Sequence, residues 1–439
     1  MYVKINNVDY TELKNLSFAP SADITGTSIP INEFQVDIYT DDTFSLGSWA
    51  NLYDDADNLW ASYIITYSQR INPEAVQIRA QSDVALLDRI TLEPCYYNGA
   101  YAESVLDETI INVSDSAPGL WAPWPYHIDD SLKSKTIAGF CPQQTARERL
   151  LWVCLVIGAY VKGSFNNEIE ILPIDNSADL IPMSDTYWRP KVTTKETVTK
   201  INVKSYSFTQ GTPQSTDKWV TDGTNYYIVT EQENSLANQS AELGTLDKEI
   251  TIEGVYLVNS SNVSTVLNML AQWYFNSTQI EADVINNAAY APGDRVMLYT
   301  DEEHIKSGYI TGAVFAFGLQ SKATLTLTGT GDIEAANLII TYLYNGMQLD
   351  KKTYLLPVGM TYTITNPYID MTMNGHRYIY RPEDEAATGT IASGTNTDTE
   401  DYDIALDLYQ GNLHIISVDE VTEVTQTVGE DEITIGVIS

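Results

Sequence analysis

The chain has 439 residues, of which 59 are Asp or Glu and 24 are Lys or Arg, so its formal net charge at pH 7 is −35. This balance excludes general binding of nucleic acid through the surface, because phosphate contacts need clustered Lys and Arg. The length predicts two to four domains. No segment has the roughly 20 apolar residues of a bilayer-spanning helix, and the N-terminal residues lack the features of a secretory signal. We therefore expect synthesis in a cytoplasm without secretion.

Residues 1–95 predict a first β domain. The opening stretch MYVKINNVDYTELKNLSF alternates between apolar and polar residues, as strands with one buried face do. The composition supports a mainly β protein, because the chain has 29 Tyr residues and many short alternating stretches.

Residues 96–188 predict a mixed α/β segment with a short helix at 102–109. A stiff loop follows, with the sequence APGLWAPWPYHIDD. Its aromatic residues suit a protein interface, where such side chains are enriched, although they could equally cover the loop's own domain. The candidate interface residues are Trp121, Trp124 and Tyr126.

The stretch TARERLLWVCLVIGAYVKGSFNNEIEIL, residues 145–172, predicts a buried helix followed by a β-hairpin. Thr145 and Glu148 match a capping box, and Gly158 stands where a helix would end. The apolar run is too short to cross a bilayer. After Gly158 the pattern changes to two strands around an Asn-Asn turn. Helical spacing places on one face Leu150, Leu151, Val153, Cys154 and Ile157.

Residues 189–335 predict a second β domain with one helix at 262–275, which Ser260 and Ser261 can cap. This domain repeats part of the first. LGSWANLYDDADNLWASYI, residues 46–64, aligns without a gap with PGDRVMLYTDEEHIKSGYI, residues 292–310.

Each copy of the repeat predicts a turn glycine, a strand, an acidic turn and two further strands. Such a meander can close into a small barrel. The alignment matches Gly47 with Gly293 and Tyr53 with Tyr299. We therefore expect the strands of Tyr53 and Tyr299 to occupy equivalent places in two similar barrels.

Residues 336–439 predict a C-terminal β module resembling a β-sandwich. Turn signals at Asn345-Gly346 and Val358-Gly359 indicate two strand pairs. After Arg381 the chain has acidic residues but no Lys or Arg, and TGTIASGTNTDTEDYD predicts a solvated loop. The module loosely resembles immunoglobulin-like or mucin-binding-like domains.

The sequence offers little for catalysis or metal binding. It has no nucleophile elbow, zinc-protease motif or phosphate-binding loop. The three cysteines are an odd number without paired spacing, so we expect buried apolar residues rather than disulfides or a zinc site. Asn396, Asp398 and Glu400 resemble a Ca²⁺ loop only faintly, because the turn glycine and the closing glutamate are missing. We expect no enzyme activity, no metal and no cofactor.

Three stretches resemble the tail-hub proteins of tailed bacteriophages and related injection systems, including the N-terminal part of tail-associated lysins. They are AQSDVALLDRITLEPCYYNG, the helix-hairpin stretch that starts at Thr145, and YAPGDRVMLYT with SGYITGAVFAFGLQSKATLTLTG. The resemblance covers about residues 1–335. It implies two tube-type β-barrels, at 1–95 and 189–335, with an inserted α/β segment between them.

The resemblance also implies a function. Hub proteins of this family form a trimeric ring at the tail tip or baseplate of the virion. Three chains with two barrels each present six similar units, which would match a hexameric tail tube or distal tail protein above and a three-fold spike, fibre or lysin below. DNA would pass through the lumen without specific binding during injection.

A second function class stays open on the residues alone. Tyr-rich strands and the C-terminal module also suit a carbohydrate- or cell-surface-binding β protein of the tail tip. The internal repeat favours the symmetry adaptor, because a ring needs repeated equivalent surfaces. We further expect part of the acidic excess to line the lumen, where it would repel DNA.

Overall fold

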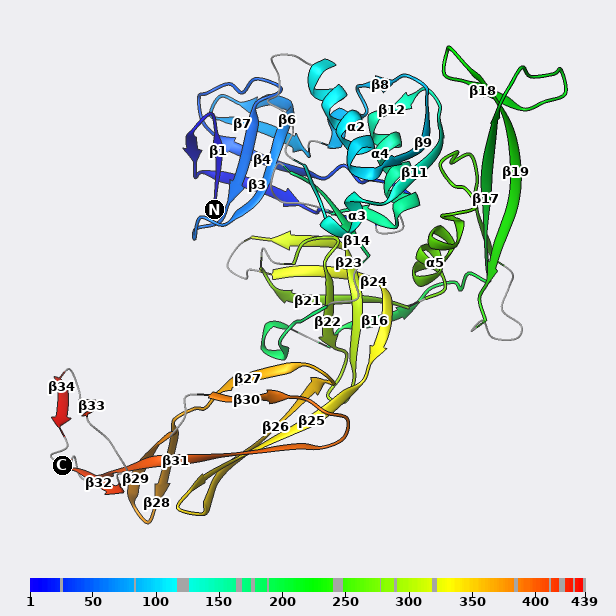
Figure 1. Ribbon diagram of the computed structural model, residues 1–439. Coiled ribbons are helices and arrows are strands. Elements are labelled where there is room, and N and C mark those ends of the chain that lie inside the picture. The colour runs from blue at the N-terminus through cyan, green and yellow to red at the C-terminus, as the bar shows by residue number, and fades with distance from the viewer. Residues whose placement is uncertain are drawn as a thin grey trace. The chain divides into compact units, whose positions relative to one another are not determined.

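In the computed structural model the chain divides into two compact units. The first unit contains Met1–Asp301 and Lys306–Gly331, and the second contains Glu302–Ile305 and Asp332–Ser439. Strands dominate both units, as the sequence predicts (Figure 1). The structure describes residues 1–23, 27–82, 84–116, 126–162, 168–174, 178–187, 189–239, 248–276, 278–287, 290–317, 322–382, 386–409, 412–417, 423–428 and 431–436.

The first barrel is built from strands that pair antiparallel, in the order β3-β4-β7-β6-β5-β1-β2. In β5 every second residue is buried, because successive side chains of a strand point to opposite faces. The strands are β1 (Tyr2–Ile5), β2 (Val8–Tyr10), β3 (Leu13–Phe18), β4 (Glu33–Tyr39), β5 (Trp49–Tyr53), β6 (Leu59–Asn72) and β7 (Ala75–Gln81).

The second barrel repeats five strands of the first in the same order. Its order is β16-β21-β24-β23-β22-β15, in which β16-β21-β24-β23-β22 correspond to β3-β4-β7-β6-β5. The sixth strand differs, because β15 pairs parallel with β22, whereas β1 pairs antiparallel with β5. The strands of Tyr53 and Tyr299, β5 and β22, therefore occupy equivalent places, as the repeat predicts, and their burial patterns are identical. The strands are β15 (Asp179–Leu180), β16 (Lys191–Thr194), β21 (Thr278–Ile285), β22 (Arg295–Tyr299), β23 (Ile305–Ala316) and β24 (Lys322–Ile333).

The gap-free alignment of the two copies is wrong by one residue after the acidic turn. The Gly47 amide donates to the Ile65 carbonyl at 2.9 Å, whereas the Gly293 amide donates to the Ile310 carbonyl at 2.7 Å. Ile310 therefore matches Ile65 rather than Ile64. The first copy has a β-bulge in the pairing of β5 with β6: Leu52 lies opposite Ala61 and Tyr53 opposite Leu59, so Trp60 is the added residue of β6.

The α/β segment lies between the barrel sequences and is built around α4 (Ala146–Ile157). The helix predicted at 102–109 extends further, as α2 (Ala102–Ser116). β13 and β14 form the predicted hairpin after α4, and β10 joins β14 in parallel. The other elements are α1 (Val84–Leu87), β8 (Thr91–Leu92), β9 (Cys95–Tyr101), β10 (Tyr126–Ile128), α3 (Asp130–Lys133), β11 (Thr136–Cys141), β12 (Gln144–Thr145), β13 (Ala159–Val161), β14 (Ile169–Pro173) and the 3-10 turn η1 (Met183–Asp185).

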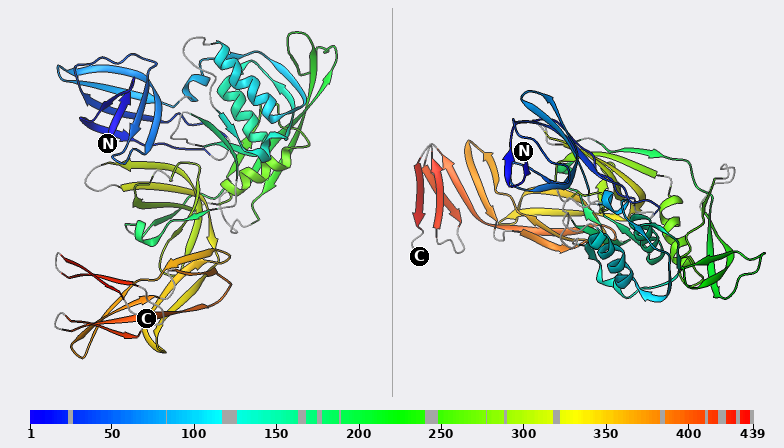
Figure 2. Two further views of the ribbon diagram at one scale, coloured as in Figure 1. Left: turned by 60° about the vertical axis from the view of Figure 1, so that its left-hand side comes forward. Right: turned by 90° about the horizontal axis from the view of Figure 1, so that it is seen from above.

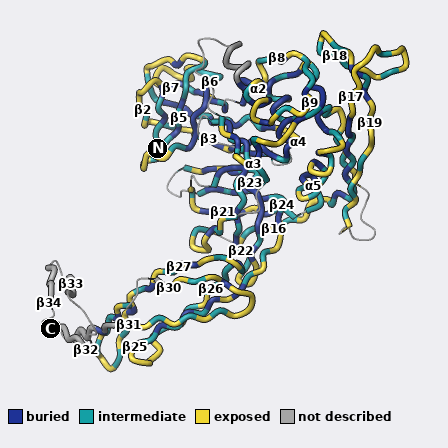
Figure 3. Tube along the Cα trace, viewed as in Figure 1, coloured by how far each residue is buried: buried dark blue, intermediate teal, exposed yellow. Residues whose placement is uncertain are grey.

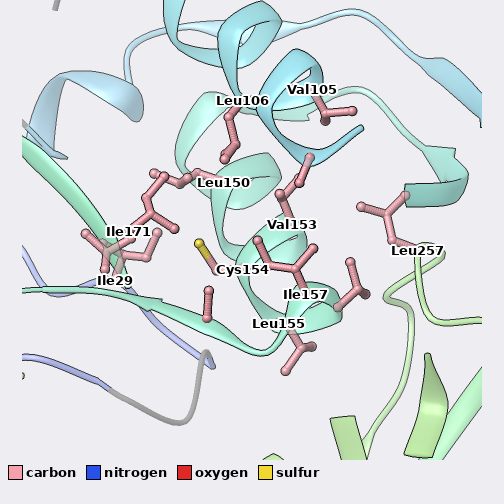
Figure 4. Packing of buried hydrophobic residues seen from close by; sticks show 14 of the residues in the cluster. Ile29, Val105, Leu106, Leu150, Val153, Cys154, Leu155, Ile157, Ile171 and Leu257 are labelled. Carbon is pink, nitrogen blue, oxygen red and sulfur yellow. The ribbon is translucent and has the colours of Figure 1, made fainter. Parts of the chain in front are cut away.

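Helix α4 has the termini that the sequence predicts. Thr145 and Glu148 form the capping box, and Gly158 ends the helix in the left-handed conformation at φ 71°. Burial is not confined to one face, however: Leu151 is only half-buried, whereas Leu155 and Val156 are buried. The helix is enclosed because α2, α5 and β11 all pack against it. Val105 and Leu106 of α2 lie against it on one side (Figure 4). Of the helices in the described ranges, none is long and apolar enough to cross a membrane.

Residues 200–274 interrupt the sequence of the second barrel and form a separate layer. Its four-stranded sheet has the order β18-β19-β17-β20, and two long strands of this sheet extend as an arm (Figure 2). The base of this sheet and α5 share the hydrophobic core of α4. The elements are β17 (Lys200–Gln210), β18 (Trp219–Thr221), β19 (Tyr226–Ala237), β20 (Glu249–Ile252) and α5 (Val263–Tyr274).

The predicted cap of α5 is wrong. Asn262 is the N-cap residue, although its side chain makes no capping bond within the helix. The Ser261 hydroxyl instead donates to the Asn259 side chain at 2.5 Å. The carboxamide oxygen of Asn262 accepts from the Asn259 amide at 2.9 Å, so the two asparagines order the turn before the helix.

The second unit is a β module whose main sheet has the order β26-β25-β31-β29-β28, with β32 paired to β31. Its core contains the fully buried rings of Tyr342 and Tyr380. The strands are β25 (Ala335–Tyr344), β26 (Met347–Pro357), β27 (Thr361–Thr365), β28 (Ile369–Met373), β29 (His376–Pro382), β30 (Ala386–Thr390), β31 (Asn396–Tyr409), β32 (Asn412–Ser417), β33 (Glu423–Val428) and β34 (Asp431–Gly436).

Only one of the two turns predicted in this module closes a hairpin. β25 and β26 pair around Asn345-Gly346, as expected. After Val358-Gly359, β27 pairs with β30 rather than β26. The predicted solvated loop is also wrong for most of its residues, which lie in β30 and β31, and only 391–395 connect the two strands. β31 pairs with β25 and β29. Its alternating Thr, Asp and Glu residues have the period of a strand, which the acidic composition concealed.

We expect Leu150→Asp to lower the free energy of unfolding by several kcal/mol, because it places an unpaired charge in a closed core. The Leu150 side chain is 0% exposed. Leu151→Asp is the matched control and should cost clearly less, since Leu151 is half-buried. Urea unfolding followed by circular dichroism measures both. If both variants lost the same free energy of unfolding, Leu150 would not lie in a closed core around α4.

Candidate assembly interface

The two barrels are joined edge to edge within the first unit. Phe18 of β3 pairs with Phe315 of β23. Just beyond, the Ala22 amide donates to the Thr311 carbonyl at 3.1 Å and the Ala313 amide donates to the Pro20 carbonyl at 3.0 Å. These contacts merge the strands of both barrels into one 13-stranded sheet.

An aromatic cluster fixes this junction. Phe18 and Phe315 stack with centroids 5.6 Å apart, and Trp60 meets the Phe315 ring edge to face at 4.9 Å. Phe317 and Tyr63 extend the contact on either side. Each such aromatic pair contributes about 0.5–1.5 kcal/mol beyond area burial. The two barrels consequently share a single hydrophobic core.

The acidic turn of the first repeat positions Trp60. The Asp54 carboxylate accepts hydrogen bonds from the Trp60 indole at 3.1 Å and from the Ala56 and Asn58 amides at 2.9 Å. Burial opposes ionisation of Asp54, but the hydrogen bonds from Asn58, Trp60 and Ala56 outweigh it and lower the pKa of this carboxyl. The turn therefore holds the indole against the second barrel.

A second junction links the α4 hairpin to the second barrel. The Tyr160 hydroxyl donates to the Gly293 carbonyl at 2.8 Å, and the Lys162 ammonium lies 2.8 Å from Asp294 and 3.9 Å from Glu170. Burial raises the pKa of Glu170 despite the neighbouring Lys162. Gly293 has a φ of 106°, and a Cβ there would lie 2.9 Å from the Tyr160 ring, so a larger residue does not fit.

A pocket of about 360 Å³ lies at this second junction. Two of its charged lining contacts lie within the protein: Lys162 binds Asp294, and the Arg295 guanidinium donates to the Ser307 hydroxyl at 3.0 Å. Because this cation and this carboxylate satisfy each other, the site has the character of a structural joint between α4 and the barrel.

The predicted aromatic loop is only partly described. Tyr126 lies in β10, and its hydroxyl donates to the Asp107 carboxylate of α2. Burial, followed by this hydrogen bond, raises the pKa of Tyr126. The half-buried ring packs on the core of α4. Trp121 and Trp124 lie outside the described residues, so their role in an interface stays a prediction.

The faint Ca²⁺ pattern proves to be one face of a strand. Asp398 accepts a hydrogen bond from the Tyr362 hydroxyl at 3.0 Å, and Glu400 accepts one from the Asn366 amide at 3.0 Å. Asn396 instead binds the loop before β31 through the Ala392 amide. Across the parts of the chain that the structure describes, no group of three or more His, Cys, Asp or Glu residues is placed to hold a metal ion.

Cys95 and Cys141 interact with each other and are not simply buried apolar residues. Cys95 of β9 faces Cys141 of β11, and Cys95 is only half-buried. A hydrogen bond from the Cys141 thiol lowers the pKa of Cys95 to about 6, although burial opposes it, and Tyr97 and Arg149 add to the lowering. Burial raises the pKa of Cys154 to about 12, so that thiol stays inert.

The sequence analysis did not identify one exposed aromatic pair. Trp219 of β18 and Tyr226 of β19 are both 47% exposed and meet edge to face at 5.2 Å on the arm. Trp219 and Tyr226 flank the turn that joins their strands, and two aromatic residues beside a turn are the signal that could have identified this pair. The half-buried Asp222 in the same turn has a pKa of about 2, because the Asn225 and Thr224 amides donate to its carboxylate.

Solved phage tail proteins share this architecture. A tail protein from Neisseria meningitidis matches with a TM-score of 0.51 at 12% identity, over 74% of this chain and 95% of that one. A 43 kDa tail protein of a Shewanella oneidensis prophage matches with a TM-score of 0.50 at 10% identity, over 74% and 97%. A Listeria monocytogenes prophage tail protein has 13% identity, coverage of 74% and 93%, and a TM-score of 0.48.

No family model and no curated protein sequence matches the chain. At 10–12% identity the likeness to the Neisseria and Shewanella proteins is one of fold. The chain has the fold of phage tail proteins, with two tube-type barrels and an inserted α/β segment, and the resemblance to the tail-hub family inferred from the sequence is confirmed at that level.

We expect Phe315→Ala to weaken the junction of the barrels and to lower the free energy of unfolding by about 3–5 kcal/mol, as for other buried Phe truncations. Phe315 is 3% exposed and touches both Phe18 and Trp60. Phe317→Ala is the matched control, because that ring is only partly buried at the margin of the same cluster. Denaturant unfolding measures both, and a loss below 1 kcal/mol for Phe315→Ala would contradict the role of the cluster.

We expect iodoacetamide at pH 7.5 to label Cys95 ahead of the other two cysteines, because a lowered pKa favours the reactive thiolate above about pH 6. The rate should fall as the pH drops through that value. Cys141→Ala removes the thiol that donates to Cys95. The pH at which the labelling rate of Cys95 is half-maximal should therefore rise. Mass spectrometry of the labelled peptides checks both, and an unchanged midpoint would show that Cys141 is not the cause.

Proposed function

We propose that the chain is a structural tail-hub protein of a phage or phage-tail-like particle, without catalytic activity. Three copies form a ring at the tail tip or baseplate of the virion. The ring adapts a hexameric tail tube, or a distal tail protein, to a three-fold tip such as a spike, fibre or lysin. The chain is made in the host cytoplasm and assembled there.

One observation carries this proposal: two barrels with five corresponding strands in the same order are joined edge to edge in one chain. A closed ring of identical surfaces needs a repeated head-to-tail contact. A chain with two equivalent barrels makes one such contact internally and leaves one for its neighbour. Three chains then supply six barrels, which suits a hexagonal tube on one side and three-fold symmetry on the other.

The net charge supports a second part of the proposal. DNA leaving a tail must not adhere, and every phosphate contact with Lys or Arg strengthens binding. With a formal charge of −35 the chain has acidic residues to line the lumen. A narrow lumen with low-dielectric walls strengthens their field, and salt limits its reach to about 8–10 Å. DNA would therefore pass without specific binding.

We expect the purified chain to have three times its mass of 48.9 kDa in sedimentation, and cryo-images of the particle to show three copies at the tip. The inner wall of the ring should be acidic. A single copy at the tip, or six copies per ring, would refute the adaptor function, and a wall rich in Lys and Arg would refute the part concerning charge. Specific glycan binding by a monomeric chain would favour a cell-surface-binding protein instead.

A further inference from the structure

We infer that the trimer forms when β16 of one copy pairs with the outer half of β6 of the next copy. This inference rests on the proposed function, since it assumes a ring. It names the partner surfaces: residues 66–72 on the first barrel and residues 191–196 on the second. The partner is a second copy of this chain, and the contact is the equivalent of the junction between the barrels within one chain.

The equivalence of the two barrels can be followed residue by residue. The Thr66 hydroxyl donates to the Arg79 carbonyl, and the Thr311 hydroxyl donates to the Thr326 carbonyl. These bonds match Thr66 with Thr311 and Arg79 with Thr326. The match is independent of the sequence alignment, because both bonds join corresponding strands of the two barrels, β6 to β7 and β23 to β24.

A second pair of contacts gives the same correspondence. Asp37 accepts a hydrogen bond from Gln77 at 2.9 Å, and Asp283 accepts one from Thr324 at 2.7 Å. Asp37 and Asp283 therefore correspond, which brings β4 and β21 into register. Through the strand pairings, Phe18 of β3 then corresponds to Val192 of β16.

The contact within one chain joins Phe18 to Phe315. Phe18 corresponds to Val192, and Phe315 corresponds to Arg70 when counted along the strand from Thr66 and Thr311. A ring of equivalent contacts therefore places Val192 of one copy opposite Arg70 of the next. The bridge between Ser21 and Gly312 has its counterpart in Lys195 and Tyr67.

Corresponding residues of the two barrels differ in exposure, and the difference marks the surfaces that have no partner within one chain. Ala313 and Phe315 are 2% and 3% exposed beneath β3, whereas their counterparts Ser68 and Arg70 are half-buried and exposed. On the other barrel, Phe18 is buried but its counterpart Val192 is 44% exposed. The same positions are covered where the barrels meet and uncovered where no partner is present.

Backbone pairing is also incomplete at both surfaces. Among the described strands, β16 pairs only with β21, so one of its edges is open. The pairing of β5 with β6 ends at Trp49 and Ile64, and β6 continues to Asn72 with β7 on one side. An open strand edge has a row of amide and carbonyl groups available for another chain. Antiparallel pairing of β16 of one copy with β6 of the next would satisfy the open edges of both strands.

The inferred contact is more polar than the junction within the chain. Phe18 and Phe315 stack, whereas Val192 meets Arg70, whose guanidinium donates to the carbonyls of Thr40 and Pro73 at 3.2 and 2.8 Å. That anchoring leaves the aliphatic part of the Arg70 side chain to cover Val192. We therefore expect the barrels of one chain to be joined before the ring closes.

A cysteine pair tests the register directly. Tyr67→Cys with Lys195→Cys, in a Cys95→Ser background, places thiols at the counterpart of the Ser21–Gly312 bridge. Directly opposite residues of antiparallel strands lie close enough for a disulfide. Oxidation by air with a copper catalyst should yield a covalent trimer on a non-reducing gel, and each single variant should yield none.

Sedimentation tests whether the chain forms a trimer, and cross-linking tests which strands pair in it. Sedimentation of the unmodified chain as a trimer, without a covalent trimer from the cysteine pair, would overturn the strand pairing and leave the hub function standing. A covalent trimer from Val8→Cys with Lys195→Cys would also overturn it, because Val8 lies on the other open edge, β2. A chain that forms no three-fold assembly would overturn both.

A charge on the open edge gives a second measurement. Val192→Asp should raise the dissociation constant of the trimer at least tenfold, because it places a carboxylate against the neighbouring strand. Val8→Asp is the matched control, since Val8 is 49% exposed on an edge strand outside the inferred contact. Equal effects of the two variants in sedimentation would contradict the inferred surface, and unchanged circular dichroism confirms that both variants fold.

Discussion

The contact between Phe18 and Phe315 is the constraint on which the rest of the first unit depends. It joins two barrels that are complete sheets in themselves and gives them a common core. Trp60 reaches this contact only because Asp54 holds its indole. The α4 hairpin binds the second barrel through Tyr160 and Lys162. Buried residues run through the strands of both barrels and through α4 (Figure 3).

Local patterns in the sequence predicted local structure well. The capping box of α4, its terminal glycine, the hairpin after it and the Asn345-Gly346 turn all depend on residues close in the chain. The repeat identified two equivalent meanders. It could not reveal the β-bulge at Trp60, because a bulge changes the register of the strands without requiring a particular residue type.

The features that the sequence did not predict are contacts between residues far apart along the chain. The pairing of β27 with β30 and of β25 with β31 brings together segments separated by other strands. Residues 200–274 look continuous with the second barrel, yet Ile201, Val203 and the buried face of α5 belong to the core of α4. The candidate interface was missed for the same reason: Val192 and Arg70 are unremarkable alone and gain meaning only when the two barrels are compared.

The acidic composition has a structural counterpart in the abundance of Tyr. With 59 acidic and 24 basic residues, the basic residues are too few to pair one to one with the carboxylates, and phenolic hydroxyls serve as additional donors. The hydrogen bond to Asp57 is the main cause that raises the pKa of Tyr2 to about 12. The donor–acceptor pairs are Tyr2–Asp57, Tyr10–Asp42, Tyr126–Asp107, Tyr227–Asp222 and Tyr362–Asp398.

The separation of Phe18 from Phe315 along the chain has a consequence for synthesis. All strands of the first barrel lie within residues 2–81, so this barrel can form early on the ribosome. Phe315 follows Phe18 by 297 residues, and at about 5–20 residues per second it emerges roughly 15–60 s later. During that interval the β3 edge is open, and β23 from a neighbouring nascent chain on the same messenger could bind it first. The long separation of the two strands along the chain thus gives exchange of barrels between neighbouring chains an interval in which to compete with the contact inside one chain.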